Sequence, residues 1–77
     1  MNYAIKADFI TGPTVYYVKG YDEQRRVPEL TDDLSRARPF ASKEDAVIWV
    51  LDHEDGWVQA GGIPKGKWSV IPIQQSS

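Results

Sequence analysis

Hydrophobic and polar residues alternate at the start of the chain. In residues 2–10, one face of an extended strand would carry only apolar side chains, those of Tyr3, Ile5, Ala7 and Phe9. A period of two predicts a half-buried β-strand. Residues 14–21 are rich in β-branched and aromatic side chains and predict a second strand. Because Gly12-Pro13 between the two runs is typical of a turn, we expect an antiparallel hairpin.

The following segment predicts a turn, a short strand and one turn of helix. Residues 22–26 are polar, as expected of a turn, and residues 27–30 predict a third strand. Pro28 has no N–H to donate, so this strand should lie at an edge of the sheet. Asp32-Asp33 offers capping oxygens before a single helical turn over residues 34–37.

The clearest helix signal starts at Ser42. Its hydroxyl can accept a free backbone N–H, which makes Ser42 a predicted N-cap. We expect the helix to run from Lys43 to about Glu54 and to stop near Gly56, a residue type that favours helix C-termini.

The apolar residues of this helix exceed what one packed face requires. The face expected to pack on the sheet comprises Ala46, Val47, Val50 and Leu51. Ile48 and Trp49 lie on its two flanks. In the simpler interpretation Trp49 covers the edge of the sheet. In the alternative, Ile48 or Trp49 contacts a partner or a dimer mate.

The C-terminal third completes the expected fold. Residues 57–60 predict a short strand, 61–67 a loop, 68–73 the last strand and 74–77 a frayed tail. Pro72 should leave one side of the last strand unpaired. We therefore expect a single α+β domain over residues 1–77. It should have a small antiparallel or mixed sheet of three to four strands, in the order β-β-(β)-α-(β)-β, with one helix packed on one face.

Composition and charge narrow the function classes. The chain has no cysteine and a single histidine, which argues against a disulfide framework, a metal site and a cofactor. No run approaches the ~20 apolar residues of a membrane span, and Lys6 and Asp8 interrupt the N-terminal apolar pattern, so we expect no membrane segment, no signal peptide and a cytoplasmic protein. Residues 32–55 have a local charge of −4, from seven acids and three bases. Basic residues are not clustered anywhere, which makes nucleic acid an unfavoured partner.

No residue pattern predicts catalysis. The Gly61–Lys67 loop, with Lys65 and Lys67, has the composition of an anion-binding loop, but it lacks the Walker pattern and precedes a strand. His53 lies beside Asp52, Glu54 and Asp55 in sequence, but consecutive residues of a helix point in different directions. A protonated histidine near a helix C-terminus is favoured by the helix dipole, so its predicted position needs no catalytic explanation. No serine has the context of an activated nucleophile. We therefore expect no enzymatic activity.

Two surfaces are candidates for contact with a partner. Tyr16 and Tyr17 are adjacent in a predicted strand and must point to opposite faces, so one lies outside the helix-covered core. Together with Tyr21 they could also stack on the bases of single-stranded nucleic acid. Asp52 and Asp55 belong to the acidic segment, which either faces water or fits a basic groove on another protein.

Two stretches carry a resemblance to known proteins. Tyr17-Val18-Lys19-Gly20-Tyr21 and the segment from Leu30 to Ala46, which contains Phe40-Ala41-Ser42-Lys43-Glu44-Asp45-Ala46, resemble a pattern found in small uncharacterised phage and prophage proteins. The resemblance implies a ββαβ-like fold and a phage accessory role, often the inhibition of a host enzyme or defence system by direct binding. It supplies no functional residue.

The sequence thus predicts a non-enzymatic protein-binding module, of the kind that a phage would encode to inhibit a host enzyme or an antiviral defence system. A small single-stranded nucleic-acid-binding protein is the alternative. The expected partner is a host or antiviral protein, and a homodimer stays open. The candidate contact residues are Tyr16, Tyr17, Tyr21, Ile48, Trp49, Asp52 and Asp55.

Overall fold

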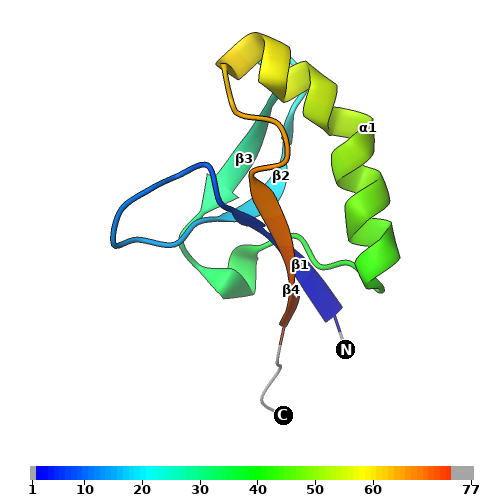
Figure 1. Ribbon diagram of the computed structural model, residues 1–77. Coiled ribbons are helices and arrows are strands. Elements are labelled where there is room, and N and C mark those ends of the chain that lie inside the picture. The colour runs from blue at the N-terminus through cyan, green and yellow to red at the C-terminus, as the bar shows by residue number, and fades with distance from the viewer. Residues whose placement is uncertain (1, 74–77) are drawn as a thin grey trace.

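A four-stranded antiparallel sheet with a long helix on one face forms the molecule (Figure 1). The computed structural model describes residues 2–73. The elements are β1 (Asn2–Ala7), β2 (Tyr17–Asp22), β3 (Val27–Thr31), the 3₁₀ turn η1 (Leu34–Arg36), α1 (Lys43–Gly61) and β4 (Trp68–Ile73). Strand order across the sheet is β3-β2-β1-β4, with every neighbour antiparallel. The predicted α+β class and the single covering helix are confirmed.

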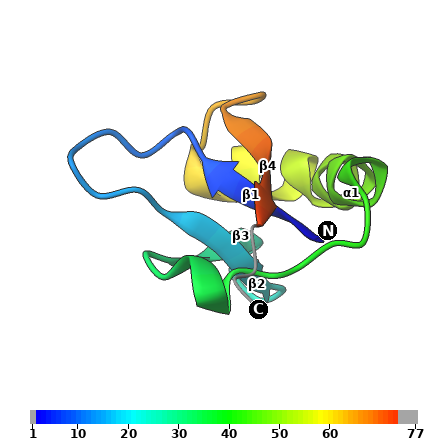
Figure 2. The same ribbon diagram turned by 90° about the horizontal axis from the view of Figure 1, so that it is seen from below.

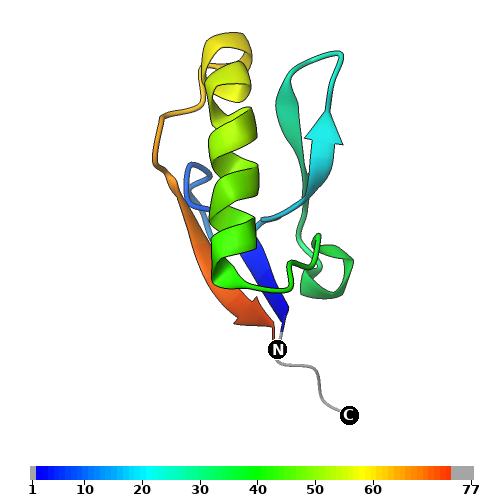
Figure 3. The same ribbon diagram turned by 90° about the vertical axis from the view of Figure 1, so that its right-hand side faces the viewer.

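The sheet consists of two strand pairs that diverge from each other. β1 pairs with β4 along its whole length, whereas its register with β2 is limited to Lys6 opposite Tyr17. Where β1 and β2 separate, Phe40 occupies the place of a strand: the Tyr3 N–H donates to the Phe40 carbonyl at 2.9 Å, and the Phe40 N–H donates back at 2.8 Å. α1 contacts β3 of one pair and β1 and β4 of the other, and in Figure 3 it lies between the two pairs. The helix therefore bridges the divergence.

The connection between β1 and β2 is longer than predicted. β1 ends at Ala7 and β2 begins at Tyr17, so Phe9 does not belong to a strand. Asp8 instead accepts a hydrogen bond from the Ser69 hydroxyl, and Gly12 has a left-handed φ of 131°. Gly12 and Pro13 thus lie in the middle of the connection, several residues beyond the last paired residue of β1. Residues 8–16 project from the body of the protein as an arm (Figures 1 and 2).

α1 begins as predicted and ends later than predicted. The Asp45 N–H donates to the Ser42 hydroxyl at 3.1 Å, which confirms the N-cap. The helix passes Gly56 and ends at Gly61, with Gly62 as the left-handed C-cap at φ 66°. The predicted end near Gly56 is wrong, and so is the predicted strand over residues 57–60. Gly56 serves packing instead: a Cβ there would lie 2.7 Å from the Tyr21 hydroxyl.

The buried side of α1 differs from the predicted one. Its buried residues are Ala46, Val50, Glu54 and Trp57. Leu51, predicted to face the core, is 57% exposed. Because the helix extends to the fully buried Trp57, the line of buried positions runs at spacings of four, four and three from Ala46. That line turns Leu51 outward, so its predicted burial is wrong.

Both outer strands carry a proline on their free edge. The backbone N–H and carbonyl of Tyr3 bond to Phe40 and thus point away from β4. Pro72, opposite Tyr3, therefore directs its backbone outward, where it has no N–H to offer. Pro28 lies on β3, the other outer strand, as predicted. Prolines at these places hinder the addition of another strand.

Candidate protein-binding surface

Two large apolar side chains lie uncovered on the outer side of α1. Ile48 and Leu51 are each 57% exposed, and among residues 2–73 the further exposed large hydrophobic residue is Val15, at 43%. Ile48 and Leu51 are three residues apart, so their side chains are neighbours on the helix surface. The two form one apolar patch on the side of the helix that faces away from the sheet.

Acidic side chains surround this patch. Glu44 precedes Ile48 by four residues, Asp52 follows Ile48 by four, and Asp55 follows Leu51 by four; all three acids are exposed. A spacing of four brings side chains together on one helix face. We refer to Glu44, Ile48, Leu51, Asp52 and Asp55 as the α1 outer face. It combines an apolar centre with a negative rim.

The surface beside Ile48 is hollowed. An open depression of about 510 Å³ is lined by Lys43, Glu44, Val47 and Ile48. Its lining is mostly apolar in character because Val47, Ile48 and the carbon chain of Lys43 contribute to it. The start of α1 therefore offers a partner side chain some relief to fit against.

Trp49 and Tyr21, both predicted as partner contacts, take part in the packing of the fold. Trp49 is half-buried; its ring lies 6.4 Å from that of Tyr21 in an edge-on arrangement and stacks on His53 at 4.4 Å. The guanidinium of Arg38 lies 5.7 Å from the Trp49 ring and 5.5 Å from the Phe40 ring. Of the two flanking residues of the predicted helix face, Ile48 is thus the accessible one.

His53 is part of the same aromatic cluster. Its Nδ1 lies 2.7 Å from the Trp49 carbonyl oxygen, one turn earlier in the helix, and its ring centre lies 4.5 Å from that of Tyr21. Because α1 continues to Gly61, His53 does not lie at the helix end where it was predicted. Within residues 2–73, no group of three or more histidine or acidic side chains is placed to hold a metal ion.

Tyr17 lies on the face of the sheet opposite α1. Ile5 belongs to the core beneath the helix, so the next residue, Lys6, points to the other face. Tyr17 pairs with Lys6 and shares that face, as expected for one of the two adjacent tyrosines. Tyr16 precedes β2 and is half-buried. The Lys6 ammonium lies 3.6 Å from Asp8, so part of the basic charge on this face is neutralised.

Glu54, a buried acid of α1, bonds to the loop whose composition predicted anion binding. Lys65 and Lys67 are exposed, but the Gly66 N–H donates to Glu54 at 2.8 Å, and the Trp68 indole N–H donates to the same oxygen at 2.7 Å. Glu54 is 3% exposed. The backbone N–H of Gly66, in the middle of this loop, is thus already bonded to a carboxylate of the protein. This role was not predicted from the sequence, because Glu54 lies among acids that were predicted to face water.

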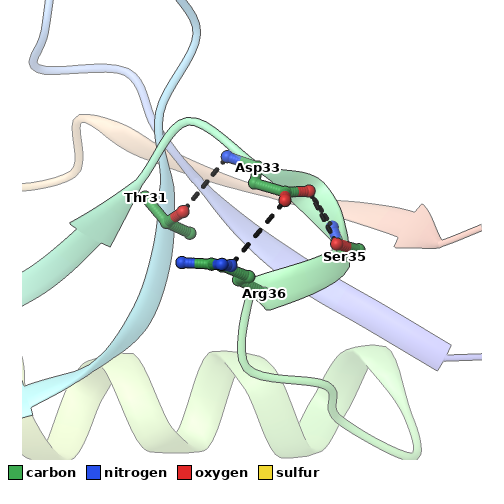
Figure 4. Close-up of polar contacts among 4 residues, drawn as sticks. All are labelled: Thr31, Asp33, Ser35 and Arg36. Carbon is green, nitrogen blue, oxygen red and sulfur yellow. Dashed lines mark hydrogen bonds and ion pairs between the residues drawn. The ribbon is translucent and has the colours of Figure 1, made fainter.

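Asp33, directly before η1, accepts hydrogen bonds from Ser35 and lies away from the α1 outer face (Figure 4). The Ser35 hydroxyl donates to Asp33 at 2.7 Å and the Ser35 N–H at 3.0 Å. These hydrogen bonds, the hydroxyl first, lower the pKa of Asp33, and Arg36 at 3.8 Å adds to the effect. Asp33 is the N-cap of η1, so the arrangement is explained by local structure.

Comparisons with known proteins supply no functional assignment for this chain. Protein-family models, curated proteins and solved structures each yield no match to the chain. Among the helices in residues 2–73, none combines the length and the apolar character that crossing a membrane requires.

Proposed function

We propose that this chain is a non-enzymatic protein-binding module that engages its partner in the cytoplasm through the α1 outer face. The observation that carries the proposal is the 57% exposure of both Ile48 and Leu51 on one side of the helix. Single exposed apolar residues are common on protein surfaces, whereas contiguous apolar patches rimmed by polar residues mark interaction sites. Burial of such surface contributes roughly 25 cal/mol per Å² on association, before the costs of binding are subtracted.

The use of the buried polar groups supports binding over catalysis. Glu54, the buried acid, accepts hydrogen bonds from Gly66 and Trp68, and the ring of His53 bonds to a helix carbonyl. Acids and bases that act in catalysis need access to a substrate. Inhibition of a host enzyme or of an antiviral defence system by direct binding, which the resemblance to phage proteins implies, would be one biological use of such a surface.

The test is capture of a partner by the wild-type chain and loss of capture by the double substitution Ile48→Ala and Leu51→Ala. Proteins retained from host lysate are identified by mass spectrometry, and the affinity of the purified partner is then measured. Truncating two apolar contacts at the centre of an interface should weaken binding at least roughly tenfold. Val15→Ala is the matched control, because Val15 is an exposed apolar residue on the arm rather than on α1. Equal affinity for the double variant and for wild type would contradict the proposal.

Single-stranded nucleic acid is the second candidate, and it relies on Tyr17. This tyrosine lies on the face of the sheet not covered by α1, near Lys6 and the exposed Lys19. Titration with labelled oligonucleotides at low salt should give binding that Tyr17→Ala weakens and that added salt reduces steeply. If the signal of the labelled oligonucleotide does not change even at high protein concentration, nucleic-acid binding is refuted, and the proposed protein binding is not affected.

A further inference from the structure

The exposed acids of α1 form no ion pair within residues 2–73. The helix contains five acidic residues and one lysine, Lys43. In residues 2–73 the two ion pairs are Lys6 with Asp8 and Arg36 with Asp33, so neither includes an α1 residue. Helices gain stability when an acid and a base are four residues apart. The positions four residues from Glu44, Asp52 and Asp55 hold only uncharged residues: Ile48, Leu51, Gly56 and Gln59.

Two of these acids also repel each other. Asp52 and Asp55 are exposed and three residues apart, and like charges at that spacing destabilise a helix. Asp55 lies in the second half of α1, where the partial negative charge of the helix end gives it no support. Glu44 lies in the first turn, where the helix dipole favours an acid, so the charge that lacks local support is that of Asp52 and Asp55. Contact with positive charge outside the chain would relieve it.

Resting on the proposed function, we infer that the partner presents an apolar pocket rimmed by lysine or arginine side chains to the α1 outer face. Ile48 and Leu51 enter the apolar part, and Glu44, Asp52 and Asp55 meet the basic rim. Complementary charges of this kind speed the encounter of two proteins and reject partners of the wrong sign. The rim pairs stay close to solvent, so their effect should be sensitive to salt.

The same charges disfavour the other occupants of this face. In a two-fold dimer the same patch meets itself. Two α1 outer faces would therefore oppose acids to acids, with only Lys43 to offset them. The phosphates of nucleic acid and the head groups of anionic membranes would be repelled for the same reason. A cationic protein surface is the occupant that satisfies both the apolar centre and the negative rim.

A phage-displayed library of random peptides supplies a defined probe. Peptides are selected on wild-type chain after removal of those that also bind a variant with Ile48→Ser and Leu51→Ser. We expect the remaining peptides to combine lysine or arginine with apolar residues. A neutralised variant, with Glu44→Gln, Asp52→Asn and Asp55→Asn, should bind the synthesised peptides on the order of tenfold more weakly.

A control variant separates the position of the charges from their number. Glu23→Gln, Glu29→Gln and Asp32→Asn remove three exposed acids outside α1 and should leave peptide affinity within about twofold of wild type. If the selected peptides are neutral or acidic, or if the neutralised variant binds as tightly as wild type, the basic rim is refuted while the proposed function stands. If no peptide depends on Ile48 and Leu51, the proposed function fails as well. Sedimentation showing a dimer that the serine variant dissociates would assign the face to a second copy and overturn the inference.

Discussion

Replacement of Glu54 should measure how much its two hydrogen bonds contribute to the stability of the fold. It is 3% exposed, and one of its oxygens accepts both the Gly66 N–H at 2.8 Å and the Trp68 indole N–H at 2.7 Å. A hydrogen bond to a charged group contributes about 1.5–3 kcal/mol. Since Gly66 is exposed and Trp68 half-buried, water can reach both donors after Glu54→Ala. We therefore expect each hydrogen bond to contribute near the lower end of this range, so that Glu54→Ala lowers the free energy of unfolding by about 2–4 kcal/mol in total.

That loss is large for a chain of this size. A 77-residue domain has roughly 4–12 kcal/mol of stability, and each kcal/mol shifts the melting temperature by about 4–8 °C. Glu54→Gln is the matched control: both donors converge on one oxygen, and an amide oxygen can accept both, so about 1 kcal/mol should be lost. Urea and thermal unfolding, followed by circular dichroism, give the two values. A Gln variant as unstable as the Ala variant would refute the reasoning, because charge rather than the acceptor would then be decisive.

Three further predictions concern other parts of the fold. Gly56→Ala should gain about 1 kcal/mol of helix propensity only in a Tyr21→Phe background, where the hydroxyl 2.7 Å from the new Cβ is absent; unfolding of the single and double variants measures this. Ser35→Ala should raise the pKa of Asp33 toward its ordinary value, as NMR titration would show. Since folding depresses this pKa, the Asp33 contribution exists above the unfolded value of about 3.9 and is lost as the pH falls through the folded value. Pro72→Val should restore an outward N–H on β4 and increase self-association in sedimentation experiments; unchanged monomer would contradict the edge argument.

Features set by local chemistry were predictable from the sequence. Ser42 caps the helix through its own hydroxyl, so the signal needs no information about distant residues. Pro28 lacks an N–H wherever it lies, and this alone confines β3 to an edge. The last strand, β4, occupies the predicted residues 68–73 because its β-branched and aromatic side chains favour an extended chain. These signals established the α+β class.

Features set by contacts between distant segments were not predictable. Gly56 has the appearance of a helix stop, but it lies where Tyr21 of β2 approaches α1, and that approach exists only in the folded chain. Glu54 resembles its acidic neighbours until Gly66 and Trp68 fold back onto it. The helix continues to the buried Trp57, and its buried side therefore differs from the predicted one, so that Leu51 lies on the surface and not in the core.

The candidate surface was predicted in part for the same reason. Ile48 was identified as a flank of the apolar helix face, and Asp52 and Asp55 as members of the acidic segment; all three are exposed. Leu51 was assigned to the core, and Trp49 either to the edge of the sheet or to a partner contact. Trp49 packs against Tyr21 of β2, which agrees with the simpler interpretation and not with the partner contact. An extended run of apolar residues shows that a helix has more than one apolar side. It does not show which side the sheet covers.

The inner side of α1 is stabilised by contacts within the protein, whereas the acids on its outer side lack ion-pair partners among the described residues. A single substitution on the outer side should test this difference. On the inner side even the charged Glu54 is satisfied by two donors. On the outer side Ile48 lies four residues from both Glu44 and Asp52, two acids without an internal partner among the described ion pairs. Ile48→Lys would place an ammonium within reach of both acids, and each such pair adds about 0.2–0.5 kcal/mol to helix stability. A helix selected for folding alone would favour that lysine. We therefore expect the variant to melt at the same or a higher temperature than wild type while losing the partner, and a variant that melts higher and still binds would show that the apolar patch is dispensable.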